Sequence, residues 1–167
     1  MKKILSVFVM LTVLIAVSCK STGAVSAIDP QEQMQIKIND TFESVYGEYR
    51  DDIILEGAEQ YIVKAGDYLS RIALHFYGPN VVNADYFPLI MLASPGVVAD
   101  PELIEPGDRL TIPNLERNLN DPNARSEIKK FLRDIAYVYD QKIAMGERNR
   151  ELYDGFRNRL TALSDSL

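Results

Sequence analysis

The side chains that most often perform catalysis or hold metals are sparse in this 167-residue sequence, which contains one histidine and one cysteine. His75 lies within an apolar helical pattern, and its position predicts a surface residue rather than a ligand or a catalytic base. Four acids lie close together at Asp100, Glu102, Glu105 and Asp108, but their spacing fits no calcium-binding loop, so a solvated acidic rim is expected. We therefore predict no catalytic residue, no metal site and no cofactor.

Sequence motifs of hydrolases do not accompany these acids. The chain has no Gly-x-Ser-x-Gly, no HExxH and no Cys–His pair. A glycosidase needs two placed carboxylates, one of them in surroundings that raise its pKa, and none of the acids lies in an obviously apolar segment. The sequence therefore predicts a protein that is not an enzyme.

The amino-acid composition excludes further classes of protein. Hydrophobic residues make up 47% of the chain, which is enough for a packed core and argues against global disorder. The formal net charge of −6 argues against nucleic-acid binding, which needs a basic surface to meet phosphates. A single cysteine excludes an intramolecular disulfide.

The first 18 residues have the pattern of an export signal. Two lysines precede an apolar run from Ile4 to Val17, which is too short for a comfortable membrane span of about 20 residues. Cys19 follows at the expected cleavage point, so residues 1–18 resemble a bacterial lipoprotein signal, with Ala16 and Ser18 as relaxed versions of the usual residues. An ordinary signal peptide or an uncleaved anchor is the alternative.

The lipoprotein resemblance implies that Cys19 is lipidated and becomes the mature N-terminus. The chain would then be held in a membrane of the cell envelope and face the periplasm, with the choice between inner and outer membrane left open. Residues 19–28 are small and polar, which indicates a flexible tether.

Residues 29–59 are expected to form a helix and a linker. Asp29 and Pro30 are typical of a helix start. Apolar residues then recur at helical spacing to about Arg50, namely Met34, Ile38, Phe42, Val45 and Tyr49. This stripe is expected to pack on the rest of the chain, and partner docking is the alternative. In the linker, residues 53–55 are either a short strand or a clip onto the core.

Residues 60–113 read as strand, helix, helix and strand. Alternation around Tyr61 and Val63 predicts a strand that ends at Gly66. Asp67 is a candidate cap for a helix with apolar residues at i, i+3, i+4 and i+7, and Gly78 ends that helix. A loop at 81–84 and a cap at Asp85 are expected before the second helix.

A Pro-Gly turn at 105–108 of the type II pattern leads into the closing strand. Two short strands at the ends of so small a segment pair most economically as an antiparallel sheet, with both helices on one face. The expected fold class is therefore α+β, a βααβ module flanked by N- and C-terminal amphipathic helices. Its expected core is Tyr61, Val63, Leu69, Ile72, Ala73, Phe76, Phe87, Ile90, Leu103, Ile104, Leu110 and Ile112.

The two ends of this segment resemble those of the LysM (lysin motif) family. The opening pattern Tyr-x-Val-x-x-Gly-Asp-x-Leu…Ile-Ala is matched by Tyr61, Val63, Gly66, Asp67, Leu69, Ile72 and Ala73. The closing pattern Asp-Pro-x-x-Ile-x-Pro-Gly-x-x-Leu-x-Ile-Pro is matched by Asp100, Pro101, Ile104, Pro106, Gly107, Leu110, Ile112 and Pro113.

The resemblance implies a βααβ fold that binds polymers containing N-acetylglucosamine, peptidoglycan in bacteria, through backbone groups of two adjacent loops. The groove residues that it implies are Gly66, Asp67, Tyr68, Leu69, Ser94, Pro95, Gly96, Val97, Leu103 and Ile104. Tyr68 stands where the family usually has Thr or Ser, Ser94 where it often has Asn, and Phe87 where a Trp is common. Tyr68 could add a sugar-stacking ring or block the groove.

Residues 114–167 are expected to be a linker to Asn123 followed by amphipathic helix. Apolar residues recur at helical spacing from Ile128 to Leu163, and Gly146 either splits this stretch in two or lies within one long helix. A small helical bundle beside the central module is expected, with a coiled-coil-like oligomer or docking arm as the alternative.

Together these patterns predict a non-enzymatic, lipid-anchored lipoprotein whose LysM module holds peptidoglycan glycan strands and links them to a membrane. The competing hypothesis is an envelope scaffold, in which the LysM module is degenerate and the helices dock a protein partner.

Overall fold

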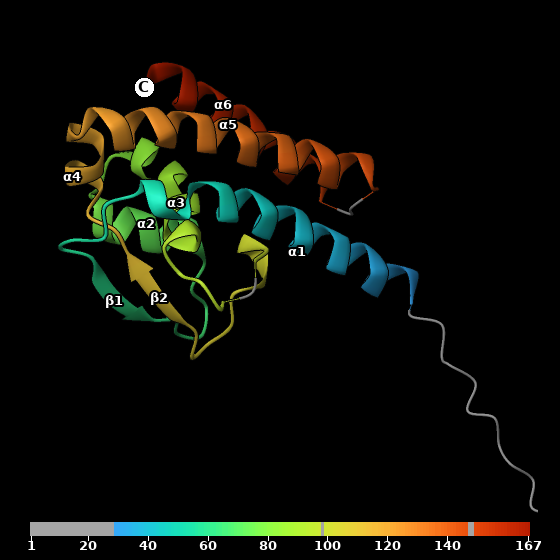
Figure 1. The fold of residues 1–167 in the computed structure, drawn as a ribbon. Helices are drawn as coiled ribbons and strands as arrows, with labels where there is room; N and C mark the ends of the chain where they lie inside the picture. The colour runs from blue at the N-terminus through green and yellow to red at the C-terminus, as the bar shows by residue number, and fades with distance from the viewer. Residues whose placement is uncertain (1–28, 98, 147–148) are drawn as a thin grey trace, which may run out of the picture.

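The computed structural model describes residues 29–97, 99–146 and 149–167. The expected signal segment, Cys19 and the tether therefore lie outside the described residues. Figure 1 shows the sheet on one side, short helices in the middle and long helices on the other side. In chain order the elements are α1 (Pro30–Tyr49), η1 (Arg50–Asp52), β1 (Glu59–Ile62), α2 (Leu69–Tyr77), η2 (Val81–Tyr86), α3 (Phe87–Leu92), η3 (Pro101–Leu103), β2 (Arg109–Ile112), α4 (Leu115–Asn120), α5 (Pro122–Ala144) and α6 (Arg150–Ser166).

The central module, residues 60–113, has the predicted two-stranded antiparallel sheet. Tyr61 of β1 lies opposite Leu110 of β2. Beyond β1, the Val63 N–H donates to the Asp108 carbonyl at 3.0 Å, and the Gly107 N–H donates to the Val63 carbonyl at 2.9 Å. Gly107 has a φ of 104°, the left-handed region that the third position of a type II turn requires. The turn before β2 therefore has the backbone that its Pro-Gly sequence predicts.

Asp67 does not cap α2, which corrects the expectation from sequence. Tyr68 is the N-cap residue of α2. The Asp67 carboxylate instead accepts the backbone N–H of Lys64 at 2.8 Å and the hydroxyl of Tyr61 at 2.7 Å. The tight turn after β1 brings this carboxylate back toward the strand, so it stabilises the turn rather than the helix end.

The segment before α3 also differs from expectation. Residues 81–86 form the 3-10 helix η2 rather than a loop. Asp85 lies within η2 and pairs with Arg159 of α6 at 2.9 Å, so it does not cap α3. α3 follows η2 without a break, Pro88 is accommodated in its first turn, and all of its residues are buried.

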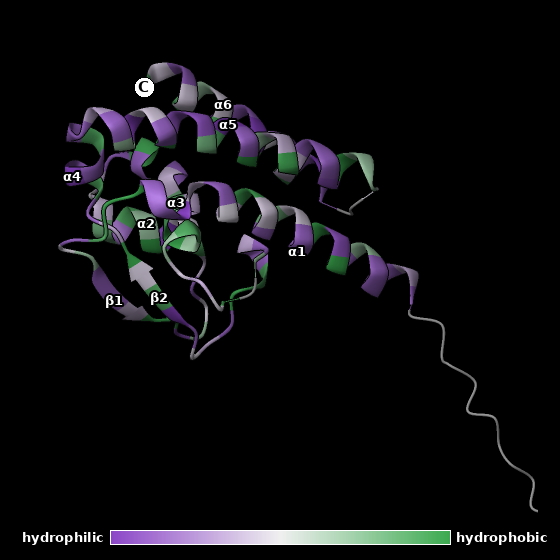
Figure 2. Cartoon of the chain, in the orientation of Figure 1, coloured by the Kyte–Doolittle hydropathy of each residue, from purple (hydrophilic) through white to green (hydrophobic). Residues whose placement is uncertain are grey.

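α1 begins and packs as its sequence predicts. The Asp29 carboxylate accepts the Gln31 N–H at 2.9 Å and so caps the helix. Ile38, Phe42 and Tyr46 form its buried face, which packs on the module and on α5. In Figure 2 hydrophilic and hydrophobic residues alternate along both α1 and α5, as on helices with one buried face.

The C-terminal stretch is two helices, α5 and α6, rather than one. Gly146 follows α5 with a φ of 86°, which ends the helix where a residue with a side chain would be strained. α5 and α6 pack on each other and share the core with α1. None of the described helices combines the length and the apolar character needed to cross a membrane.

The expected linker 114–123 contains a helix, α4, which corrects the prediction. Asn114 caps it by accepting a backbone N–H of its first turn. The Asn118 side chain accepts the Ile54 N–H at 2.8 Å and donates to the Ile54 carbonyl at 2.9 Å. Residues 53–55 form no strand. Ile53 is buried and Asn118 fixes the backbone of Ile54, so this segment packs on the core, the second of the two expected alternatives.

A single core joins the module to the long helices. Leu103 was expected within it but is 40% exposed, because the single turn of η3 buries Pro101 and leaves Leu103 outside. Tyr61, Phe76 and Ile104 are partly buried against the core. The remaining expected core residues are buried, and they are Val63, Leu69, Ile72, Ala73, Phe87, Ile90, Leu110 and Ile112.

Candidate functional site

Two loops of the central module carry the residues that were expected to bind glycan. They are the β1–α2 loop (residues 63–68) and the α3–β2 loop (residues 93–108). Exposure differs widely among the ten residues. Gly66, Tyr68, Pro95, Gly96 and Leu103 are exposed, Asp67, Val97 and Ile104 are half-buried, and Leu69 and Ser94 are buried.

A cavity of about 480 Å³, the cleft, lies between these loops and helix α6. It brings together four of the expected residues, namely Asp67, Tyr68, Leu69 and Ile104. The rest of its lining is Ser70, Phe87, Pro101, Glu102, Leu152, Phe156 and Arg159. The cleft therefore has the predicted loops on one side and a helix outside the module on the other.

A second hollow of about 540 Å³ lies along the α3–β2 loop and shares Glu102 and Ile104 with the cleft. It holds Gly96, Val97, Leu103 and Ile104. The expected residues that line a hollow are therefore spread over two adjacent hollows. Gly66, Pro95 and Ser94 line neither hollow.

Ser94 lies beneath the surface rather than on it. Its side chain is buried; the hydroxyl donates to the Ile90 carbonyl at 2.5 Å and accepts the Thr111 N–H at 2.9 Å. These bonds join the end of α3 to β2. Ser94 thus shapes the α3–β2 loop from below and is not placed to contact a ligand.

Tyr68 is the most exposed aromatic residue of the cleft, at 50%. The Arg71 guanidinium lies 4.3 Å from the centre of its ring and donates to its hydroxyl at 3.0 Å. Both residues lie at the start of α2, so the contact is local. The ring is thereby held at the mouth of the cleft rather than left free to rotate.

Only part of the expected solvated rim forms in the α3–β2 loop, because Glu105 is exposed and Asp108 is half-buried, whereas Asp100 is buried. Asp100 is 2% exposed, and Lys142 of α5 donates to its two carboxylate oxygens at 3.0 and 2.9 Å. Lys142 also pairs with Glu102, whose side chain is 24% exposed. We call these three residues the Lys142 cluster. Among the residues that the structure describes, no group of acids, histidines and cysteines is arranged to hold a metal ion.

One ammonium in the Lys142 cluster faces two carboxylates. Burial alone would raise the pKa of Asp100, but Lys142 more than offsets it and the pKa is lowered. Burial and the nearby Asp100 charge raise the pKa of Glu102 to about 7, although Lys142 opposes them. Burial would lower the pKa of Lys142, and the two carboxylates raise it. Of the two carboxylates, Glu102 therefore retains a proton more readily than Asp100.

Further contacts fasten the α3–β2 loop to the long helices. Gln35 of α1 donates to Asp100 at 2.9 Å, and the buried Tyr46 hydroxyl donates to the Ala99 carbonyl at 3.0 Å. Tyr139 of α5 donates to Glu102 at 2.7 Å. This loop is thus fixed from outside the module by both α1 and α5.

Reasoning from sequence missed the residues that α1, α5 and α6 contribute. Lys142 had a detectable signal, because it lies three and four residues after Tyr139 and Val138 on the buried face of α5. A lysine at such a position requires a buried acidic partner. Leu152, Phe156 and Arg159 had no comparable signal, since an amphipathic pattern does not say what lies opposite each face.

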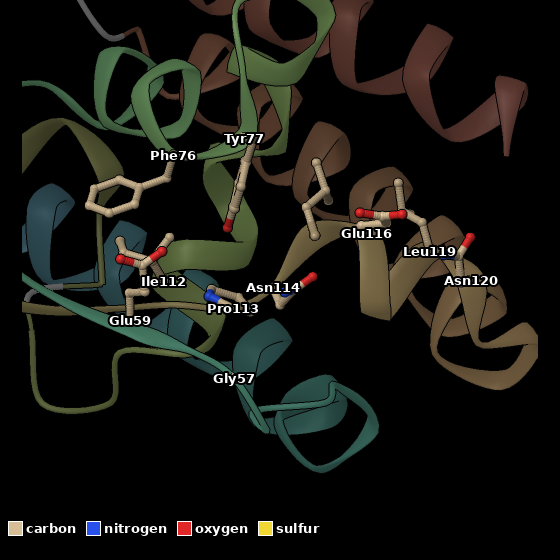
Figure 3. A pocket seen from close by; sticks show the side chains of 11 residues that line it. Gly57, Glu59, Phe76, Tyr77, Ile112, Pro113, Asn114, Glu116, Leu119 and Asn120 are labelled. Atoms are coloured by element: carbon tan, nitrogen blue, oxygen red, sulfur yellow. The ribbon is translucent and has the colours of Figure 1, made fainter.

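Another cavity of about 480 Å³ lies between the module and α4 (Figure 3). It contains none of the expected site residues. Glu59, Asn114 and Glu116 give it a polar lining, and Figure 3 shows the Tyr77 side chain among them. The Tyr77 hydroxyl is buried without a hydrogen-bond partner, and burial raises its pKa.

A two-stranded antiparallel sheet with two helices on it and a cleft at its loops defines a small binding module. Residues 61–113 match the family model described as LysM domain. This segment is therefore a LysM domain, which indicates binding of glycan such as peptidoglycan. Comparison with curated proteins and with solved structures found no significant match to the chain.

Proposed function

We propose that this chain is a non-catalytic protein of the cell envelope that binds peptidoglycan through its LysM domain. The observation that carries this proposal is the cleft, in which the β1–α2 and α3–β2 loops of a LysM domain meet. An N-acetyl sugar offers an amide, hydroxyls and a methyl group. Backbone groups of the two loops can pair with the amide, and the Tyr68 ring and Ile104 can contact the apolar parts.

The carboxylates at the cleft support binding without hydrolysis. Glycoside hydrolysis needs two carboxyl groups directed at the scissile bond. Both oxygens of Glu102 are engaged instead, one by Tyr139 at 2.7 Å and the other by Lys142. Asp67 has one oxygen held in its turn by Lys64 and Tyr61. Although Glu102 has a raised pKa, its contacts direct it into the protein.

The proposal includes a lipid anchor at Cys19, supported by the signal-like residues before it. The protein would then face the periplasm and connect a membrane to the wall. A single LysM domain is expected to bind weakly, and tethering would raise its effective concentration at the wall. Labelling cells with a radioactive fatty acid tests this part, since a Cys19→Ser variant should take up no label.

Co-sedimentation with purified wall sacculi tests glycan binding. The full chain, kept in detergent, should pellet with sacculi in a saturable manner. A Tyr68→Ala variant should pellet less, whereas Tyr137→Ala should not, because Tyr137 is 62% exposed on α5 and lies outside the cleft. Recovery of the unaltered protein in the supernatant at every concentration would contradict the proposal.

That negative result would favour the second candidate, an envelope scaffold that docks a protein. The observation in its favour is a shallow groove between α1 and α5, where Val45 and the exposed Tyr137 lie among polar residues. In that case Tyr137→Ala, rather than Tyr68→Ala, should weaken capture of an envelope protein.

A further inference from the structure

One wall of the cleft does not belong to the LysM domain. Tyr68 and Leu69 line it from the β1–α2 side, and Ile104 lines it from the α3–β2 loop. The opposite lining comes from α6, which begins at Arg150, well beyond the matched segment 61–113. A ligand held by the two loops therefore lies against a helix that the family match does not include.

The α6 residues of this wall form a stripe on one side of the helix. Leu152, Phe156 and Arg159 are spaced by four and three residues, so they project from the same side. Tyr153 and Leu160, offset from them by one residue, are buried toward the core. α6 thus has one face for packing and a second face that lines the cleft.

Aromatic and ionic contacts fix the cleft-lining face of α6 against the LysM domain and against α5. The Phe156 ring lies 5.4 Å from the ring of Phe87, at the start of α3, and 5.2 Å from that of Tyr139. Arg159 pairs with Asp85 of η2 at 2.9 Å and lies over the Phe156 ring at 5.0 Å. These contacts set the width of the cleft before any ligand enters, which lowers the entropy lost on binding.

Two large apolar side chains from distant parts of the chain are left exposed on this cleft. Tyr68 is 50% exposed and Leu152 is 46% exposed. Phe156 is half-buried with Arg159 over its ring, so Leu152 is the more exposed apolar side chain that α6 offers the cleft. A pyranose ring with an N-acetyl group has apolar faces and a methyl group that match such surfaces.

We propose that Leu152 of α6 contacts the N-acetyl sugar that the LysM loops bind, so that the binding site is shared between the LysM domain and the C-terminal helix. This inference rests on the proposed glycan-binding function. It adds a residue outside the family match to the recognition of the sugar and makes α6 part of the site.

Titration of the full chain in detergent with N-acetylglucosamine oligomers of defined length, followed by calorimetry, tests it. Leu152→Ala should weaken binding by about tenfold, the effect expected when a half-buried leucine contact is lost. Ile36→Ala is the matched control, because Ile36 is also 46% exposed and lies on α1 outside the cleft. It should bind as tightly as the unaltered protein.

A second variant reports the contact directly. The chain has no tryptophan, so Leu152→Trp introduces a unique fluorophore at the cleft and Ile36→Trp one elsewhere. Oligomer should shift the emission of the first variant to shorter wavelength and leave the second unchanged. If the unaltered protein binds but both Leu152 variants match their Ile36 controls, the shared site is wrong and the glycan-binding proposal stands. If the unaltered protein binds no oligomer, both fail.

Discussion

The two loops that meet at the cleft are held in different ways. In the β1–α2 loop, Asp67 bonds to Lys64 and Tyr61, which are three and six residues away in the chain. In the α3–β2 loop, Asp100 bonds to Lys142 and Gln35, which are 42 and 65 residues away. The first loop is set by its own sequence, whereas the second, besides its local turn at Gly107, is tied at Asp100 to helices outside the LysM domain. The shape of the cleft therefore depends on parts of the chain that lie outside the matched segment 61–113.

Removing α1, α5 and α6 should have the largest effect on the α3–β2 loop and on the stability of the LysM domain. A fragment of residues 60–113 loses the cation and the side-chain donors that Lys142, Gln35 and Tyr139 supply to Asp100 and Glu102, and it exposes the core face that packs on α1 and α5. Domains of this size have little core to spare. We expect circular dichroism of the fragment to show no cooperative thermal transition. A transition close to that of the full chain would mean that the second loop is as self-sufficient as the first.

Lys142→Ala should produce the next largest effect, because it leaves two carboxylates buried with no cation. Breaking a buried ion pair from one side costs about 3–5 kcal/mol of unfolding free energy. Lys130→Ala is the matched control: Lys130 pairs with Glu127 but its side chain is 58% exposed, so its loss should cost under about 1 kcal/mol. Chemical denaturation measures both, and equal losses would refute the role given to the Lys142 cluster.

The stability of the second loop should also depend on pH. The pKa of Glu102 is raised from 4.5 to about 7, so the folded state keeps a proton that the unfolded chain releases, and stability falls as pH rises across this window. The pKa of Asp100 is lowered and that of Lys142 is raised. Their contributions to the free energy of unfolding therefore change only below pH 4 and above pH 10, outside the range in which Glu102 titrates. The free energy of unfolding should fall by about 2 kcal/mol between pH 5 and 7.

Glu102→Gln removes the titrating group and supplies the control for that dependence. Denaturation midpoints of this variant should vary less between pH 5 and 7 than those of the unaltered protein. An identical pH profile for the two proteins would show that another group is responsible.

Asp67→Ala, in the first loop, should have a smaller effect than Lys142→Ala. It removes the acceptor of the Lys64 N–H and the Tyr61 hydroxyl at an exposed turn, where water can replace the lost bonds, so the loss of unfolding free energy should be smaller than for Lys142→Ala. Asp108→Ala is a milder counterpart, since Asp108 accepts a single backbone N–H, from Glu105, at 2.8 Å. Denaturation should rank Lys142→Ala, Asp67→Ala and Asp108→Ala in that order; the reverse ranking would overturn the comparison.

The features that could be predicted from sequence are those set by residues close together in the chain, as in the β1–α2 loop. The strand order, the turn at Gly107, the Asp29 cap and the α1 stripe depend on neighbouring residues, and local patterns identified them. The site was predicted less completely. The LysM resemblance implied ten groove residues, of which the structure brings Asp67, Tyr68, Leu69 and Ile104 together at the cleft and buries Ser94.

The remaining features depend on tertiary contacts that no short pattern encodes. Leu115 to Asn120 were assigned to a linker because the segment is too short for a periodic pattern, yet Asn118 bonds to Ile54 and the segment is helical. The pairing of Lys142 with Asp100 and the placement of Leu152 on the cleft require knowledge of how α5 and α6 lie on the module.

The attachment of α1 to the α3–β2 loop has a mechanical consequence. For a chain anchored at its N-terminus, as proposed, and bound to the wall through its cleft, tension enters at the start of α1. Gln35 and Tyr46 join α1 directly to Asp100 and Ala99, so the load passes from helix to glycan-binding loop without crossing the two-stranded sheet. Pulling along α1 loads its packing against α5 in shear, with many side chains resisting together. Such a load path would suit a protein that connects the membrane to the wall while the two move relative to each other.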